Sequence, residues 1–186
     1  MNSELKQTFL GGRVVVVVGD ITREGVDAMV NAANSSLMGG GGVDGAIHRG
    51  GGPRILEACR EIRKTIHPDG LPTGEAVITT AGDLPAQYVI HTVGPIYGRH
   101  EGHESQLLAA CYTNSLRLAV ERSLASIAFP AISTGVFGYP SAEAAQVSSE
   151  TIKSYVTTAD VINEVRLVFF QERDAQIFLD HQRFVG

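Results

Sequence analysis

The residues from Asn31 to His48 combine side-chain amides, four consecutive glycines, a carboxylate and an imidazole within eighteen positions. The glycines at 39–42 forgo side-chain packing and are costly to order, so something must require bare backbone there. Consecutive glycine N–H groups can turn toward one anion, and the apolar spacing from Val43 to Ile47 predicts a helix directly after them. The segment is therefore predicted to bind phosphate beside polar side chains.

Two nucleotide-binding patterns fit this glycine run poorly. Gly40–Gly45 matches the spacing G-x-G-x-x-G, but the dinucleotide fingerprint places its glycines directly after the first strand, and Ser35–Met38 intervene here. No Gly-Lys-Ser/Thr follows, which excludes a nucleotide-hydrolase phosphate loop. The run is also unsuited to a plain flexible linker, because helix-compatible residues follow it at once.

Other polar clusters favour structural interpretations. His100 and His103 are three residues apart around a glycine, whereas a zinc protease helix sets its histidines four apart, so a solvated loop is expected. Ser133 stands at a strand-to-helix turn but lacks the first glycine of a serine-hydrolase elbow, which favours ligand binding through the loop backbone. His67 and His91 are interpreted as ordinary loop and strand residues.

Asp44 allows two interpretations from the residues alone. A carboxylate in the first turn of a helix is stabilised by the helix dipole, which is a structural role. However, Asp44 stands two residues after a glycine run predicted to bind phosphate, and the phosphate would repel its carboxylate unless the side chain points elsewhere. A nearby sugar or water molecule would give the carboxylate a functional role. Asn34 is likewise either a turn former or a ligand group.

Composition limits the class of protein. The 186 residues fit one domain, 1–186, and 44% hydrophobic with 6% aromatic residues and no Trp favours packed α/β layers. The net charge of −5 disfavours a polynucleotide partner but not a small anionic ligand. Cys59 and Cys111 are expected to be reduced and buried, which fits a cytoplasmic location. No secretory leader or membrane span is expected.

Strands and helices alternate along the chain. The predicted strands cover 13–18, 27–31, 76–80, 87–93, 126–132 and 165–170, and the predicted helices 54–66, 105–122, 142–156 and 174–184. Such alternation indicates a mostly parallel sheet covered on both faces, whose ligands bind beyond the carboxyl ends of the strands. Three segments there are expected to meet in one cleft: Gly19–Ile21, Asn34–Asp44 and Ser133–Gly138.

Taken in order, six motifs resemble the macrodomain family, specifically its MacroD-type hydrolases, from about residue 14 to residue 178. They are Gly19-Asp-Ile-Thr22, Val26-Asp-Ala28, Asn31-Ala-Ala-Asn34, Gly39 to His48, His91-Thr-Val-Gly-Pro95 and Ser133-Thr-Gly-Val-Phe-Gly138. The resemblance implies a three-layer α/β/α sandwich with a mixed, mostly parallel sheet. It further implies an ADP-ribose cleft at the carboxyl ends of the strands and removal of mono-ADP-ribose from acidic side chains of proteins.

The resemblance also assigns binding residues. Asp20, with the Ile21 backbone beside it, would accept a hydrogen bond from the adenine amino group, and Phe170 would stack on adenine, with Phe169 as the competitor because strand alternation sends one of the two into the core. Phe137 would also pack near the distal ribose. The two halves of a diphosphate clamp would be Gly40, Gly41, Gly42 and Val43, and Ser133, Thr134, Gly135, Val136 and Phe137.

Three catalytic roles follow from the resemblance. Asn34 would hydrogen-bond the hydroxyls of the distal ribose. Asp44, assisted by the substrate's own diphosphate, would activate water near C1 of that ribose, and His48 would support the ribose or Asp44. Neither a metal nor a cofactor is implied.

Alternative functions stay open at this stage. Deacetylation of O-acetyl-ADP-ribose, which breaks a related ester in the same cleft, is expected as well. The chain could instead read ADP-ribose without turnover. It could also be a phosphatase of ADP-ribose 1″-phosphate, although such macrodomains carry Ala where Asp44 stands. The expected partners are mono-ADP-ribosylated proteins, with ADP-ribosylated nucleic-acid ends not excluded and a monomer favoured.

Overall fold

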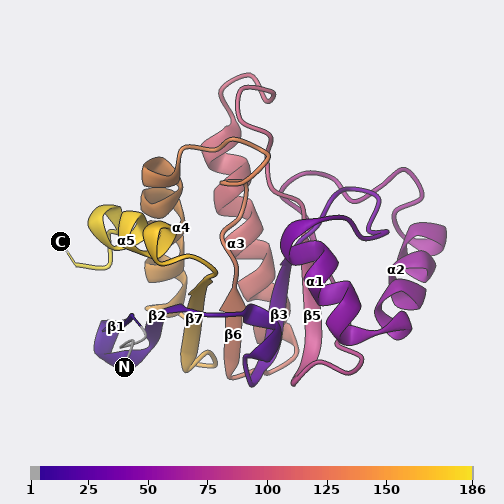
Figure 1. Cartoon of the computed structure of the whole chain (residues 1–186), viewed down its shortest axis with the longest axis horizontal. Coiled ribbons are helices and arrows are strands. Elements are labelled where there is room, and N and C mark those ends of the chain that lie inside the picture. The colour runs from indigo at the N-terminus through magenta and orange to yellow at the C-terminus, as the bar shows by residue number, and fades with distance from the viewer. Residues whose placement is uncertain (1–4, 186) are drawn as a thin grey trace.

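Residues 5–185, which the computed structural model describes, form one seven-stranded sheet with helices on both faces (Figure 1). The strands are β1 (Lys6–Phe9), β2 (Val14–Val18), β3 (Val26–Ala32), β4 (Ala76–Thr80), β5 (Ala86–Thr92), β6 (Ser126–Phe129) and β7 (Glu164–Phe169). The helices are α1 (Gly42–Gly51), α2 (Pro53–Thr65), α3 (Glu104–Glu121), α4 (Ser141–Val156) and α5 (Glu172–His181), with short 3-10 turns η1 (Leu10–Gly12) and η2 (Ile21–Arg23).

The strand order is β1-β2-β7-β6-β3-β5-β4. The inner strands β2, β7, β6, β3 and β5 are parallel, and the edge strands β1 and β4 are antiparallel to their neighbours. This confirms the predicted three-layer α/β/α sandwich with a mixed, mostly parallel sheet. Because parallel strands share their direction, the carboxyl ends of β2, β7, β6 and β3 lie at one edge of the sheet.

Two hydrophobic cores occupy the two faces of the sheet. In β3, Ala28 and Val30 belong to the core that α3, α4 and α5 cover, whereas Met29 belongs to the core under α1 and α2. Alternation along a strand therefore places Asn31 on the α1 and α2 side, beside Met29. In β5, the same alternation places His91 on that side with Val89.

The structure corrects the predicted bounds of β6 and α5 and adds one strand that was not predicted. β6 ends at Phe129 rather than at residue 132, because Pro130 has no N–H to continue a ladder. α5 covers 172–181 rather than 174–184, and β1 was not predicted at all. Within residues 5–185, no helix combines the length and apolar character needed to cross a membrane.

Asp27 ties the amino ends of β3 and β6 together. Its Oδ2 accepts hydrogen bonds from the backbone N–H groups of Ala125 (2.8 Å) and Ser126 (3.1 Å), and the hydroxyl of Ser126 accepts from the Asp27 N–H. This residue of the Val26-Asp-Ala28 motif lies at the sheet edge opposite to the predicted ligand segments. Its role in the structure is to set the spacing of two strands.

Replacing Asp27 by Ala should lower the free energy of unfolding by about 2 kcal/mol, because two part-buried N–H donors lose a charged acceptor. Asp27→Asn should lose less, since it keeps an acceptor oxygen. Urea denaturation measures both values, with Asp160→Ala as a control that removes the same charge from an exposed site. Equal stability of Asp27→Ala and wild type would contradict this role.

Candidate functional site

The predicted ligand segments follow neighbouring strands along one edge of the sheet (Figure 1). Asp20 follows β2, Phe170 follows β7, residues 133–137 follow β6, and residues 34–44 follow β3. The sheet order brings these segments together in that sequence, although they lie far apart in the chain. A ligand lying along this edge would meet each of them in turn.

The glycine run presents unused backbone donors at the start of α1. The N–H groups of residues 39–44 donate to no group within 5–185, because the first helical hydrogen bond begins at Gly45. Gly39 and Gly42 have φ values of +88° and +57°, a left-handed conformation that favours glycine. The predicted helix thus begins inside the run, and its N-terminus offers several N–H groups to an anion.

A second set of unused donors lies in the loop after β6. None of the described residues accepts a hydrogen bond from the N–H groups of 134–137. The loop is closed by hydrogen bonds from Tyr139 N–H to the Ser133 carbonyl (2.9 Å) and from Tyr97 N–H to the Phe137 carbonyl (2.9 Å). Since β6 and β3 are neighbours, the two loops with free donors begin on adjacent strands.

Asp20 and Phe170 stand at the other end of this edge. One oxygen of Asp20 accepts from the backbone N–H (2.9 Å) and hydroxyl (2.7 Å) of Thr22, which fixes the carboxylate at the start of η2. Phe170 is 82% exposed, whereas Phe169 is buried with its ring centroid 5.2 Å from that of Phe178. Of the two phenylalanines, Phe170 is therefore the one open to a ligand.

The three predicted catalytic side chains surround the start of the glycine run. A methyl group on Gly40 would lie 3.1 Å from Asp44 Oδ2 and 3.3 Å from Asn34 Nδ2, so these two groups flank the same position. Asn34 donates to the Gly39 carbonyl (2.9 Å), and the Ser36 hydroxyl donates to Asn34 Oδ1. The side chain of Asn34 is thus held from both ends.

Asp44 is only 6% exposed and lies in the first turn of α1. Its Oδ1 accepts a hydrogen bond of 2.8 Å from Asn31 Nδ2. His48, one turn further along α1, places Nε2 3.4 Å from the same oxygen without hydrogen-bond geometry. The Asn31 amide therefore fixes one oxygen of this carboxylate in the first turn of α1.

Sequence reasoning gave no role to the side chains behind Asp44. Asn31 Nδ2 lies 3.1 Å from His91 Nδ1, and His91 Nε2 lies 2.8 Å from the Thr79 hydroxyl. The prediction that His91 is an ordinary strand residue omits these contacts. One signal in the sequence could have found them. Asn31 and His91 are polar residues in otherwise apolar strands, at positions where strand alternation turns the side chain toward the core.

Burial controls the protonation of the groups around His91. Desolvation, with a smaller effect of His48, lowers the pKa of His91 to about 3, so its ring is neutral at neutral pH. Burial and the nearby charge of Asp44 raise the pKa of the Cys59 thiol to about 12. Burial also raises the pKa of Cys111 to about 11. Both cysteines are free and buried, as predicted.

One cluster has ligand types suited to a metal ion. His48, Cys59 and His91 offer ligand atoms within 4.8 Å of one another, and imidazole with thiolate is typical of zinc sites. Both ring nitrogens of His91 already have hydrogen-bond partners, and the Cys59 thiol is protonated. A metal would have to displace these partners, so the cluster fits a hydrogen-bonded network better.

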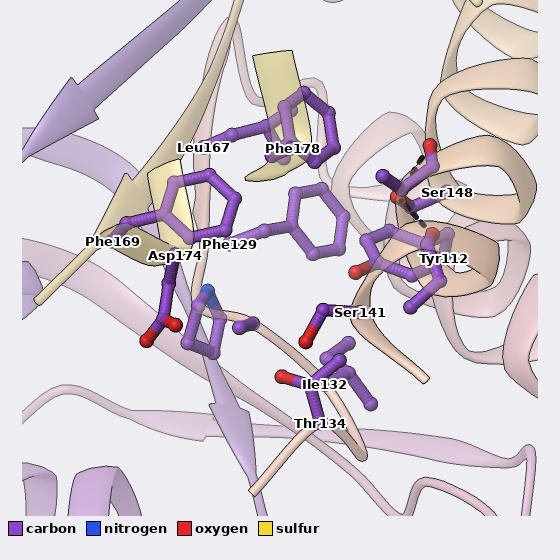
Figure 2. Close-up of a pocket in the computed structure, with 14 residues that line it drawn as sticks. Tyr112, Phe129, Ile132, Thr134, Ser141, Ser148, Leu167, Phe169, Asp174 and Phe178 are labelled. Carbon is purple, nitrogen blue, oxygen red and sulfur yellow. Dashed lines mark hydrogen bonds between the residues drawn. The ribbon is translucent and has the colours of Figure 1, made fainter. Parts of the chain in front are cut away.

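A cavity of about 30 Å³ lies on the opposite face of the sheet, against α4 and α5 (Figure 2). Its wall includes the aromatic rings of Phe129, Phe169 and Phe178, and Thr134 is the one predicted ligand residue among its lining groups. This volume holds about one or two water molecules, not a nucleotide. The candidate site is therefore the open edge above the strands rather than this cavity.

Comparisons with known proteins agree with this arrangement. The Macro domain family model matches residues 30–148. A macro domain-containing protein of Streptomyces nogalater is 57% identical over 84% of each chain, and a protein of Escherichia coli K12 named O-acetyl-ADP-ribose deacetylase is 52% identical over 89% of this chain and 93% of its own length. The solved structure of the Oceanobacillus iheyensis macrodomain with ADP is 46% identical and superposes with a TM-score of 0.91 over 96% of this chain and 94% of that chain. The chain therefore belongs to the macrodomain family.

Proposed function

We propose that this chain binds ADP-ribose along the carboxyl edge of the sheet and hydrolyses ester bonds at the distal ribose. The order of groups along the edge supports this orientation. Asp20 and Phe170 offer an acceptor and an aromatic face to adenine, and the two loops with free N–H groups offer donors to the diphosphate. Asn34 and Asp44 then meet the distal ribose.

The observation that carries the hydrolase proposal is the environment of Asp44. A carboxylate that served only the helix N-terminus would need no buried partner, yet Asn31 fixes its Oδ1 at 2.8 Å. Its Oδ2 flanks the same glycine as Asn34, the proposed ribose ligand. A held carboxylate beside the ribose site can orient a water molecule and accept its proton.

The same water can attack two related esters. In mono-ADP-ribosylated Asp or Glu, water attacks C1 of the distal ribose and the bond from C1 to the carboxyl oxygen breaks, which releases ADP-ribose and the protein carboxylate. In O-acetyl-ADP-ribose, water attacks the acetyl carbonyl carbon and the bond from this carbon to the ribose oxygen breaks, which releases acetate and ADP-ribose with its hydroxyl restored. In each case the proton of water passes to Asp44, with the diphosphate as a second acceptor. The name of the Escherichia coli relative favours the second substrate.

The proposed partners are thus mono-ADP-ribosylated proteins and O-acetyl-ADP-ribose. We also propose a cytoplasmic location, since two buried free thiols suit a reducing compartment. A reader that binds without turnover is the alternative, and it would not need a fixed carboxylate at the ribose. A phosphatase of ADP-ribose 1″-phosphate would have to bring its monoester dianion against Asp44, which charge repulsion opposes.

Asp44→Asn should reduce release of ADP-ribose from a glutamate-linked substrate by about 100-fold or more, because an amide cannot accept the proton of water. Deacetylation of O-acetyl-ADP-ribose should fall in parallel. Chromatography of the products measures both rates, and calorimetry should show retained ADP-ribose binding. The control Asp160→Asn changes an exposed acid remote from the site.

Assays of the wild-type protein distinguish the enzyme from the reader. Tight ADP-ribose binding without turnover of either ester would contradict the hydrolase proposal and support the non-catalytic reader. Release from only one ester would restrict the proposal to that substrate. Full turnover by Asp44→Asn would remove Asp44 from the mechanism while leaving the binding site intact.

The adenine end can be tested from two different strands. Phe170→Ala and Asp20→Ala should each weaken ADP-ribose binding about tenfold in calorimetry, because one removes an aromatic face and the other a charged acceptor. Asp20→Ala also removes a cap of η2, whereas Phe170→Ala leaves the backbone contacts unchanged. Ile66→Ala, which removes an exposed apolar side chain from the end of α2, is the control. Unchanged affinity in both variants would place adenine elsewhere.

A further inference from the structure

A buried chain of hydrogen bonds runs from β4 through β5 and β3 to Asp44. It connects Thr79, His91, Asn31 and Asp44, and His91 and Asn31 are completely buried. The strand register sets this alignment, because Asn31 stands opposite His91 in the parallel pair of β3 and β5. The network thus fastens the proposed catalytic carboxylate to the middle of the sheet.

The contacts of this hydrogen-bond network assign each donor and acceptor in turn, starting from Thr79. The Thr79 hydroxyl donates to the Thr80 carbonyl at 3.0 Å, so toward His91 it offers a lone pair and the His91 Nε2 carries the proton. His91 Nδ1 is then an acceptor. The Asn31 side-chain NH₂ group has two hydrogens, one for His91 Nδ1 and one for Asp44 Oδ1.

The amide of Asn31 is oriented by these two acceptors alone. Its Oδ1 is buried and has no partner among the residues that the structure describes. Without these acceptors the amide would rotate to an orientation in which Oδ1 accepts a hydrogen bond, since a buried carbonyl oxygen without a partner is costly. The orientation seen therefore depends on lone pairs at both His91 Nδ1 and Asp44.

We propose that His91 is a positioning residue, whose Nδ1 lone pair holds the Asn31 amide so that its N–H faces and fixes Asp44. This inference rests on the proposed hydrolase function of the same site. Without that lone pair the amide can rotate by half a turn, and its oxygen then faces Asp44 Oδ1. Two oxygens repel each other there, and the carboxylate moves away from the ribose site.

The surroundings of His91 keep this lone pair free. His48 and Cys59 have ligand atoms within 4.8 Å of those of His91, Cys59 Sγ lies 3.8 Å from Nε2, and Asp44 lies beyond the Asn31 amide. Burial and His48 lower the pKa of His91, so that Nδ1 stays unprotonated through the physiological range. The thiol of Cys59 is protonated and adds no charge.

Two substitutions separate positioning from stability. His91→Asn keeps an acceptor oxygen near the place of Nδ1 but loses the contact with Thr79 and leaves a larger void. His91→Gln keeps a polar group near the place of Nε2 but has no acceptor at Nδ1. If His91 is purely structural, the less stable variant, His91→Asn, should also lose more activity. If His91 is a positioning residue, His91→Gln should lose more activity although it is the more stable of the two.

We expect kcat of His91→Gln on O-acetyl-ADP-ribose to fall by about tenfold to 100-fold, with KM and the Kd for ADP-ribose changed by no more than about threefold. His91→Asn should keep more than about a third of kcat although it melts at the lower temperature. Ile127→Val, in the core on the other face, is the control for a mild loss of packing. Equal kcat in the two His91 variants, or a lower value in His91→Asn, would overturn the proposal.

A measurement without turnover keeps this test independent of the proposed function. In ¹⁵N-labelled wild type, the two-bond ¹H–¹⁵N spectrum should show His91 with Nε2 protonated and Nδ1 free. The carboxyl ¹³C signal of Asp44 should shift in His91→Gln and much less in His91→Asn. The opposite tautomer, or an Asp44 signal unaffected by His91→Gln, would overturn the inference even for an active enzyme. An inactive wild type with the expected spectra would overturn the hydrolase function instead.

The lowered pKa of His91 also predicts how stability depends on pH. Between about pH 6.5 and pH 3 the unfolded chain protonates this histidine and the folded chain does not, so the free energy of unfolding decreases as the pH falls through this window. His91→Asn should show a smaller decrease than wild type in urea denaturation from pH 7 to pH 4. Identical slopes would mean that His91 is protonated in the folded state, which would overturn the proposed direction of hydrogen bonding.

Discussion

The hydrogen bond from Asn31 to Asp44 is the contact on which the site depends, because it joins the sheet to the first turn of α1. α1 begins in a run of glycines that has few side chains of its own to anchor it. Its position is secured by Ile47 in the core below and by this bond at its N-terminus. The free N–H donors and the carboxylate are therefore fixed together, and a shift of one would shift the other.

The glycines make this arrangement possible by removing bulk as well as by bending the chain. Gly45 is an example, since a methyl group there would lie 2.5 Å from the Gly40 carbonyl. The loop can consequently fold back over the helix that follows it, and its N–H groups have no acceptor among the described residues. Negative charge is thus attracted by the loop while a negative side chain is retained beneath it. In the proposed function, binding and proton transfer would be carried by different atoms of one short segment.

The sequence was sufficient for the parts that depend on local pattern. Apolar runs and their breaks predicted the layers, and the glycines with Asn34, Asp44 and His48 were predicted to lie together where the structure places them, after β3. β1 was not predicted because only Phe9 of its four residues is buried, so Lys6–Phe9 shows no strand pattern of its own. Alternation predicted that one of Phe169 and Phe170 enters the core, but only the packing of α5 selects Phe169.

The network behind Asp44 could not be predicted for a different reason. Asn31 and His91 are sixty residues apart, and they meet only because β3 and β5 pair in one register. A slip of one residue would turn either side chain to the other face of the sheet. Two buried polar residues on apolar strands are costly unless they satisfy each other, so they constrain the register as much as they depend on it. The pairing of these strands and the orientation of Asp44 are in this sense one structural requirement.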